Sequence, residues 1–65
     1  MTIEEIREAV SKIEEAKWDD ETAHSMEDAL HKRVLEAIAN GASNPSELAA
    51  EALKTRDIDF EHWCA

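Results

Sequence analysis

Apolar residues recur at helical spacing in three segments of the chain, and the pattern is strongest between residues 23 and 40. On a helical wheel of about 100° per residue, the apolar positions of this segment fill roughly half the circumference. They are Ala23, Met26, Leu30, Val34, Leu35, Ala37 and Ile38. An arc this wide predicts a central helix that packs between two neighbours.

The N-terminal segment has a narrower apolar stripe, which is typical of a helix with one buried face. The stripe consists of Ile3, Ile6, Ala9, Val10, Ile13 and Ala16. Thr2 and Glu5 have the spacing of a capping box, which predicts that this helix begins at Ile3. We expect Trp18 to extend the stripe beyond the last turn.

Both ends of the central helix carry sequence signals. The acidic run 19–21 suits the positive end of a helix dipole, so the N-cap is Asp19 or Asp20. Gly41 can adopt the left-handed conformation that closes a helix without steric cost. These signals predict a long central helix that ends at residues 40–41.

A third helix is predicted to start at Pro45, with Asn44 as its N-cap and Glu47 placed for a capping box. Its apolar stripe consists of Leu48, Ala49, Ala52 and Leu53. The small alanines permit a close approach to the central helix. We expect this helix to end near Thr55 or Arg56.

The C-terminal tail carries the only Phe and the second Trp. Asp59 could cap one last helical turn through His62, which would place Phe60 and Trp63 on the same side. We expect these rings, with Ile58, to form a lid over the seam between the central and third helices. The alternative is a free peptide motif whose aromatic residues dock into another protein.

These patterns predict an all-α fold: a small three-helix bundle with a short C-terminal helical turn that closes the core. A chain of 65 residues forms one domain, here spanning residues 1–65, and buries about 60% of its unfolded surface. Hydrophobic residues make up 43% of the chain, and Gly and Pro occur once each. Such a composition favours a compact helical domain over a disordered segment.

The chain is strongly acidic, with 16 Asp and Glu residues, 7 Lys and Arg residues and a formal charge of −9. Its negative field repels phosphate backbones and anionic lipids, so we expect no direct nucleic-acid or membrane binding. Cys64 is the only cysteine, which excludes an internal disulfide. With neither a signal peptide nor an apolar run of roughly 20 residues, we expect a cytoplasmic protein, monomeric or weakly homo-oligomeric.

One group of side chains has the residue types of a metal site. His24, Glu27, Asp28 and His31 fall within about 100° of one face of the central helix. Helical metal sites draw ligands from several helices, however, and the first and third helices contain no histidine. We therefore expect no metal or cofactor, and interpret Glu27 and His31 as an ion pair or hydrogen bond at the core boundary.

We also expect no catalytic nucleophile, because no rigid element orients His62 beside Cys64. Residues 34–53 resemble the first two helices of bacterial helix-turn-helix domains. The segment that follows them, 57–63, is too short and acidic for a recognition helix.

A second resemblance rests on the segments AHSMEDAL at 23–30, VLEAIA at 34–39, ALKT at 52–55 and IDFEHWCA at 58–65. On these residues the chain is similar to small, uncharacterised helical proteins of actinobacteria and their phages. The resemblance implies a bacterial or phage cytosolic origin and no particular activity.

We therefore expect a non-enzymatic protein-interaction module, one form of which is a phage-encoded modulator of a host protein. Its acidic surface on the first and third helices would meet a basic patch or mimic nucleic acid. The alternative is a metal-binding protein or a small metal-dependent enzyme that uses His24, Glu27, Asp28 and His31. A bundle of this size has little interior left for a substrate pocket.

The charge predicts negligible affinity for duplex DNA at physiological salt. Fluorescence anisotropy with a labelled duplex measures this directly. Measurable binding at that ionic strength that weakens steeply as salt is added would contradict the prediction. Such a dependence of the binding constant on salt concentration reports how many DNA phosphates the protein neutralises.

Overall fold

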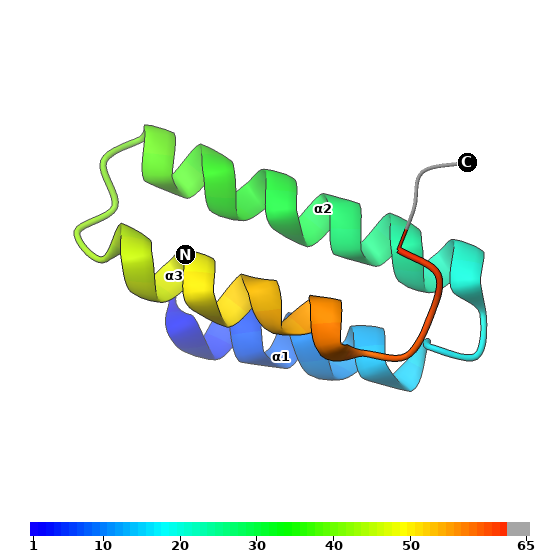
Figure 1. Cartoon of the computed structure of the whole chain (residues 1–65). Helices are drawn as coiled ribbons and strands as arrows, with labels where there is room; N and C mark the ends of the chain where they lie inside the picture. The colour runs from blue at the N-terminus through cyan, green and yellow to red at the C-terminus, as the bar shows by residue number, and fades with distance from the viewer. Residues whose placement is uncertain (63–65) are drawn as a thin grey trace.

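Three α-helices and one short 3-10 helix make up the described part of the chain. The computed structural model describes residues 1–62, and they contain no β-strand. The helices are α1 (Ile3–Glu15), α2 (Asp20–Ala39) and α3 (Pro45–Ala52), followed by the 3-10 helix η1 (Leu53–Asp57). They run up, down and up, so that α1 and α3 are parallel and α2 is antiparallel to both (Figure 1). The predicted three-helix bundle is confirmed.

The start of α1 follows from the capping box at Thr2 and Glu5. The Glu5 backbone N–H donates to the Thr2 hydroxyl at 3.1 Å, and the Thr2 N–H donates to the Glu5 carboxylate at 2.8 Å. Each side chain thus satisfies a backbone donor that the first helical turn leaves without a partner.

The two ends of α2 are closed by local interactions. Asp19 is the N-cap, and its carboxylate accepts from the Thr22 backbone N–H at 3.2 Å. At the other end Gly41 has φ +90°. Its N–H bonds to Ile38 O and the N–H of Ala42 bonds to Ala37 O. This pair of bonds is the Schellman motif, which requires the left-handed conformation that glycine adopts without strain.

The third helix begins at Pro45 as predicted, but its expected capping box does not form. Asn44 occupies the N-cap position and makes no side-chain capping hydrogen bond. The start of α3 therefore depends on Pro45, whose fixed φ is compatible with the first helical turn and whose missing N–H needs no partner there.

The core lies along the axis where all three helices meet, and each helix contacts the other two. Its buried apolar residues are Ile6, Ile13, Ala23, Leu30, Val34, Leu48, Ala52 and Ile58. Val10 and Ile38 pack against this core while remaining partly exposed. The prediction that the central helix packs between its two neighbours is confirmed.

Within residues 1–62, three large apolar side chains lie on the surface against expectation: Trp18 is 89% exposed, Leu35 66% and Leu53 58%. Trp18 follows the end of α1 at Glu15, so the helical spacing no longer places it on the buried stripe. Its ring instead lies 5.2 Å from the Lys17 Nζ. On α3 and η1 the buried face runs through Leu48, Ala52 and Thr55, which turns Leu53 outward.

The tail also differs from its predicted form. Residues 58–60 form bends and residues 61–62 have no regular secondary structure, so the turn expected from Asp59 to His62 is wrong. Ile58 ends η1 in an extended conformation (φ −78°, ψ 135°), and this redirects the chain across the bundle. Ile58 and Phe60 pack on the core. Trp63, the other ring of the expected lid, and Cys64 lie outside the described residues.

Leu30 and Leu35 offer a matched test of this core because both lie on α2. Leu30 is 3% exposed, so Leu30→Ala should lower the free energy of unfolding by about 2–5 kcal/mol. Leu35→Ala should change it by less than about 1 kcal/mol, because the side chain is already in water. Urea unfolding followed by circular dichroism measures both values. Equal effects of the two substitutions would contradict the described orientation of α2.

Candidate functional site

A cluster of polar side chains lies inside the bundle, between α2 and the C-terminal third of the chain. We call Glu27, His31, Thr55 and His62 the polar cluster. Glu27 is 2% exposed and Thr55 is fully buried. Burial of a carboxylate is costly unless it is paired and hydrogen-bonded. Throughout residues 1–62, every buried side-chain nitrogen and oxygen has a hydrogen-bond partner.

His62 bridges the tail to the Glu27 carboxylate. Its Nδ1 lies 3.0 Å from each oxygen of Glu27, and its Nε2 lies 2.8 Å from the backbone oxygen of Ile58. Carboxylate and carbonyl oxygens only accept hydrogen bonds, so both ring nitrogens must donate. This geometry assigns two protons, and a positive charge, to the His62 ring. The Phe60 ring covers it, with 4.0 Å between the ring centroids.

His31 and Thr55 form the other half of the polar cluster. The Thr55 hydroxyl donates to the Ala52 backbone oxygen at 3.1 Å, and His31 Nε2 lies 3.0 Å from the same hydroxyl oxygen. A hydroxyl has a single proton, so its bond to Ala52 leaves the oxygen to accept from His31 Nε2–H. Thr55 thereby connects η1 to α2.

The two charges of the pair stabilise each other. Burial raises the pKa of Glu27, but the hydrogen bond from His62, the neighbouring Thr55 hydroxyl, and the charges of His62 and His31 together outweigh it, so the pKa is lowered overall. The hydrogen bond to Glu27 raises the pKa of His62, with the Ile58 carbonyl adding to it, and burial opposes both. The pair is thus ionised in the window between the lowered pKa of Glu27 and the raised pKa of His62.

The four residues predicted as the weak metal candidates do not act as one group. Glu27 pairs with His62 and His31 with Thr55. His24 Nε2 lies 3.5 Å from Asp28 Oδ2, and the Asp28 side chain is 59% exposed. Within residues 1–62, no three His, Cys, Asp or Glu side chains are grouped to hold a metal ion.

The expected pairing of Glu27 with His31 is therefore wrong, because the partner of Glu27 comes from the tail. Sequence reasoning missed this pairing because His62 is 35 residues away from Glu27. It also missed Thr55, which lies on the stripe of Leu48 and Ala52 at positions i+7 and i+3. This helical spacing from Leu48 and Ala52 could have indicated, from the sequence, that Thr55 is buried.

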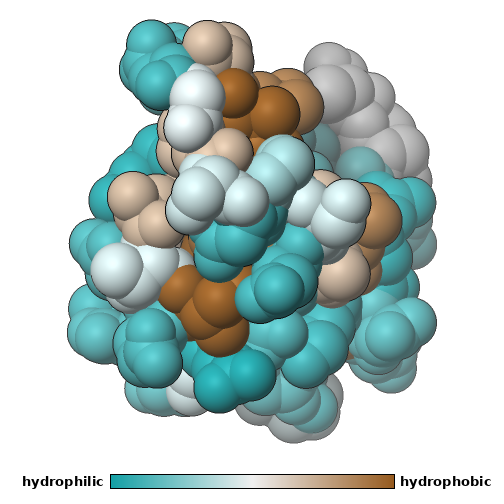
Figure 2. All heavy atoms as spheres, turned by 90° about the vertical axis from the view of Figure 1, so that its left-hand side faces the viewer, coloured by the Kyte–Doolittle hydropathy of each residue, from teal (hydrophilic) through white to brown (hydrophobic). Residues whose placement is uncertain are grey.

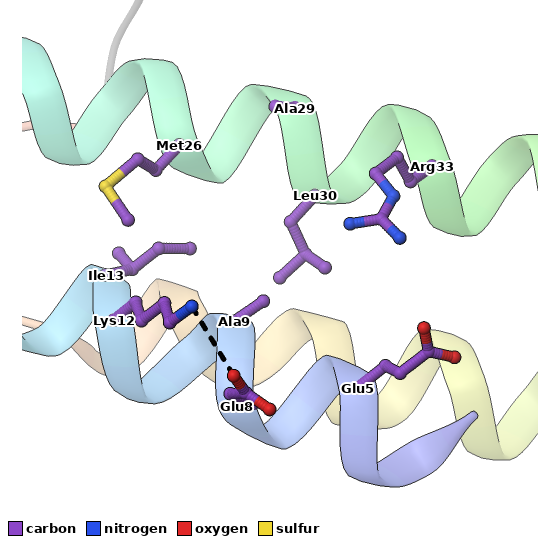
Figure 3. Close-up of a pocket in the computed structure, with 9 residues that line it drawn as sticks. All are labelled: Glu5, Glu8, Ala9, Lys12, Ile13, Met26, Ala29, Leu30 and Arg33. Carbon is purple, nitrogen blue, oxygen red and sulfur yellow. Dashed lines mark ion pairs between the residues drawn. The ribbon is translucent and has the colours of Figure 1, made fainter. Parts of the chain in front are cut away.

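A second feature is a groove of about 340 Å³ between α1 and α2. It is lined by Glu5, Glu8, Ala9, Lys12, Ile13, Met26, Ala29, Leu30 and Arg33. Figure 3 shows Ile13, Met26 and Leu30 pointing into the space between the helices, and Glu5 facing Arg33 across it. Lys12 and Glu8 form an ion pair of 3.4 Å on its α1 side. The groove thus has an apolar floor and a charged rim.

The opposite side of α1 is tied to α3 by an ion-pair network. Glu51 is 7% exposed, and its carboxylate lies 2.7 Å from both Arg7 Nε and Lys54 Nζ. Hydrogen bonds from Lys54 and Arg7 lower the pKa of Glu51. Both cations are engaged with a carboxylate of the same chain, so we interpret this site as structural.

Comparison of the chain with protein-family models, curated proteins and solved structures gave no match. The resemblance to phage and actinobacterial proteins therefore stays a prediction. Among the described helices, none combines the length and the apolar character needed to cross a membrane.

Glu27→Gln tests the polar cluster, because it removes the negative charge while keeping the shape of the side chain. At about pH 6 we expect it to lower the free energy of unfolding by about 1.5–3 kcal/mol, the range for a hydrogen bond to a charged group. Since the pKa of His62 is raised in the folded state, this contribution should fade as the pH rises through that pKa.

The matched control is Asp28→Asn, the equivalent change at an exposed carboxylate that pairs with His24. It should cost less than about 1 kcal/mol. Chemical denaturation of both variants at several pH values gives the comparison. If Glu27→Gln cost no more than Asp28→Asn, the buried pair would not stabilise the fold.

Proposed function

We propose that this protein is a non-enzymatic interaction module that binds an amphipathic helix of a partner protein, with Lys or Arg beside the apolar stripe of that helix. The observation that carries the proposal is the groove between α1 and α2, with its apolar floor and its place on a highly acidic chain. On the resemblance described above, the partner would be a bacterial host protein.

The shape of the groove supports a helical ligand. Two helices form its walls, and Ala9 and Ala29 contribute only methyl groups where side chains of a third helix would enter. Met26 lines the same space with a flexible, polarisable side chain that adapts to different apolar partners. Helix-in-groove recognition uses this combination, with apolar anchors of the ligand at i, i+3, i+4 and i+7.

The charge distribution supports a basic partner. On the rim itself the acids are matched, since Glu8 pairs with Lys12 and Glu5 faces Arg33 (Figure 3). The wider surface carries the net charge of −9, so a basic ligand is attracted from a distance and a second copy of this chain is repelled. Figure 2 shows that hydrophilic residues cover most of one end of the bundle, with smaller apolar patches between them.

The polar cluster supports a role without catalysis. Both nitrogens of His62 are used in hydrogen bonds, and the Thr55 hydroxyl is fully buried. A general base needs an available nitrogen or oxygen within reach of a substrate. These groups are instead directed at one another.

Two synthetic helices test the proposal: an amphipathic Leu/Lys peptide and its Leu/Glu counterpart. We expect the basic peptide to bind and the acidic one not to bind. Shift changes in nitrogen–proton NMR spectra should concentrate at Ala9, Ala29 and Leu30. Ala29→Lys should weaken binding by about tenfold or more, because it places a charge in the apolar groove.

Ala50→Lys is the matched control, since Ala50 is also an exposed alanine of a helix but lies on α3, outside the groove. It adds the same positive charge, so it should weaken binding only by the loss of long-range attraction. Equal weakening by the two variants would place the docking surface elsewhere. Failure of the basic peptide to bind at low salt would contradict the proposed function itself.

A further inference from the structure

Several contacts hold the segment 58–62, the C-terminal strap, against the helices, among them the packing of Phe60 on the core. Ile58 is buried in the core with 7% exposure. The Glu61 N–H donates to Asp20 Oδ1 at 3.4 Å, and His62 is bonded to Glu27. Among these contacts, the bond from His62 involves a side chain whose ordinary pKa lies near neutral pH.

A neutral imidazole does not fit this site. It has one N–H donor, whereas His62 faces an acceptor at each nitrogen, the Glu27 carboxylate at 3.0 Å and the Ile58 oxygen at 2.8 Å. After loss of one proton, a nitrogen lone pair would face an oxygen lone pair at one of these short distances. The ring must then turn or move away, whichever proton is lost.

From this geometry we propose that the C-terminal strap is a pH-operated latch. It is closed while the His62 ring carries both protons, and it is released from α2 when the ring becomes neutral. The latch and the groove between α1 and α2 use different residues, because Glu27 and His31 bond to His62 and Thr55 and do not line the groove.

The charged groups around His62 come from the two elements beneath the strap. On α2, Glu27 bonds directly to the ring, His31 adds to the field at Glu27, and Asp20 holds the backbone of Glu61. On η1, Arg56 opposes the positive form of His62. The bond to Glu27 is the strongest of these influences, so the pKa of His62 in the closed state is raised above that of an exposed histidine.

The direction of the switch follows from this shift. Protonation of the His62 ring stabilises the closed state. This stabilisation is at its maximum below the pKa that His62 has when the strap is released. Between that pKa and the higher one of the closed state, the ratio of closed to open forms falls by up to about tenfold per pH unit. Above the closed-state pKa nothing of this contribution remains. Acidification therefore closes the latch, and mild alkali opens it.

Release would change the surface of the molecule. Phe60 and Ile58, which now pack on the core, would be freed from it. The Glu27 carboxylate, now 2% exposed, would meet water and keep its charge without its partner. A small rise in pH would thus convert a covered seam into an apolar and acidic cleft.

The test uses the full chain and follows two quantities between about pH 5.5 and about pH 9. The first is backbone order in the strap, from nitrogen–proton NOE values of residues 59–62. The second is the protonation of His62, from its ring carbon shifts. We expect strap order to be lost with the same midpoint at which His62 loses its proton, while the amides of α1 and α2 stay ordered.

Two variants assign the effect to one histidine. His62→Gln should loosen the strap at every pH and abolish the transition. His31→Gln removes the other histidine of the polar cluster and should leave the transition in place. Coincident midpoints in the unaltered chain support the latch even if a variant does not fold. A strap that stays ordered after His62 has become neutral, or a transition that persists in folded His62→Gln, would overturn it.

Discussion

The Glu27 carboxylate is the constraint around which the second half of the chain is arranged. It lies in the middle of α2 with 2% of its surface exposed, where an unpaired charge would be strongly unfavourable. The change from α3 to η1 and the extended Ile58 bring the chain back to α2 and place His62 on the carboxylate. An apolar residue at this position would leave His62 without its charged partner.

This arrangement explains why an interior so small contains charged and polar groups at all. Apolar burial alone does not fix where residues 58–62, which lack regular structure, lie, because Ile58 and Phe60 could pack in several positions. The His62 ring can satisfy these bonds in only one orientation, with Nδ1 bonded to the two carboxylate oxygens of Glu27 and Nε2 bonded to the Ile58 oxygen. We interpret the pair as a source of structural specificity, which is an attested use of buried polar groups.

The helices could be predicted from the sequence because their signals are local. The capping box at Thr2 and Glu5 and the left-handed Gly41 each act within a few residues, and the structure contains both. The polar cluster could not be predicted, because Glu27 and His62 are brought together only by the packing of all the elements between them. The exposed Trp18 was missed for a similar reason, since helical spacing gives the wrong face once the helix has ended.

The direct contact between α1 and α3 has a consequence for how the chain folds. In a bundle where only consecutive helices touch, each hairpin can form on its own as the chain is made. Here Leu48 and Ala52 of α3 belong to the same buried core as Ile6 of α1, and the bond from Arg7 to Glu51 joins the two helices across 44 residues. Closing so long a loop lowers the conformational entropy of the chain before any stabilising contact between α1 and α3 has formed. During synthesis, α1 and α2 should therefore remain incompletely packed until α3 has left the ribosome, and the chain should then fold in a single step.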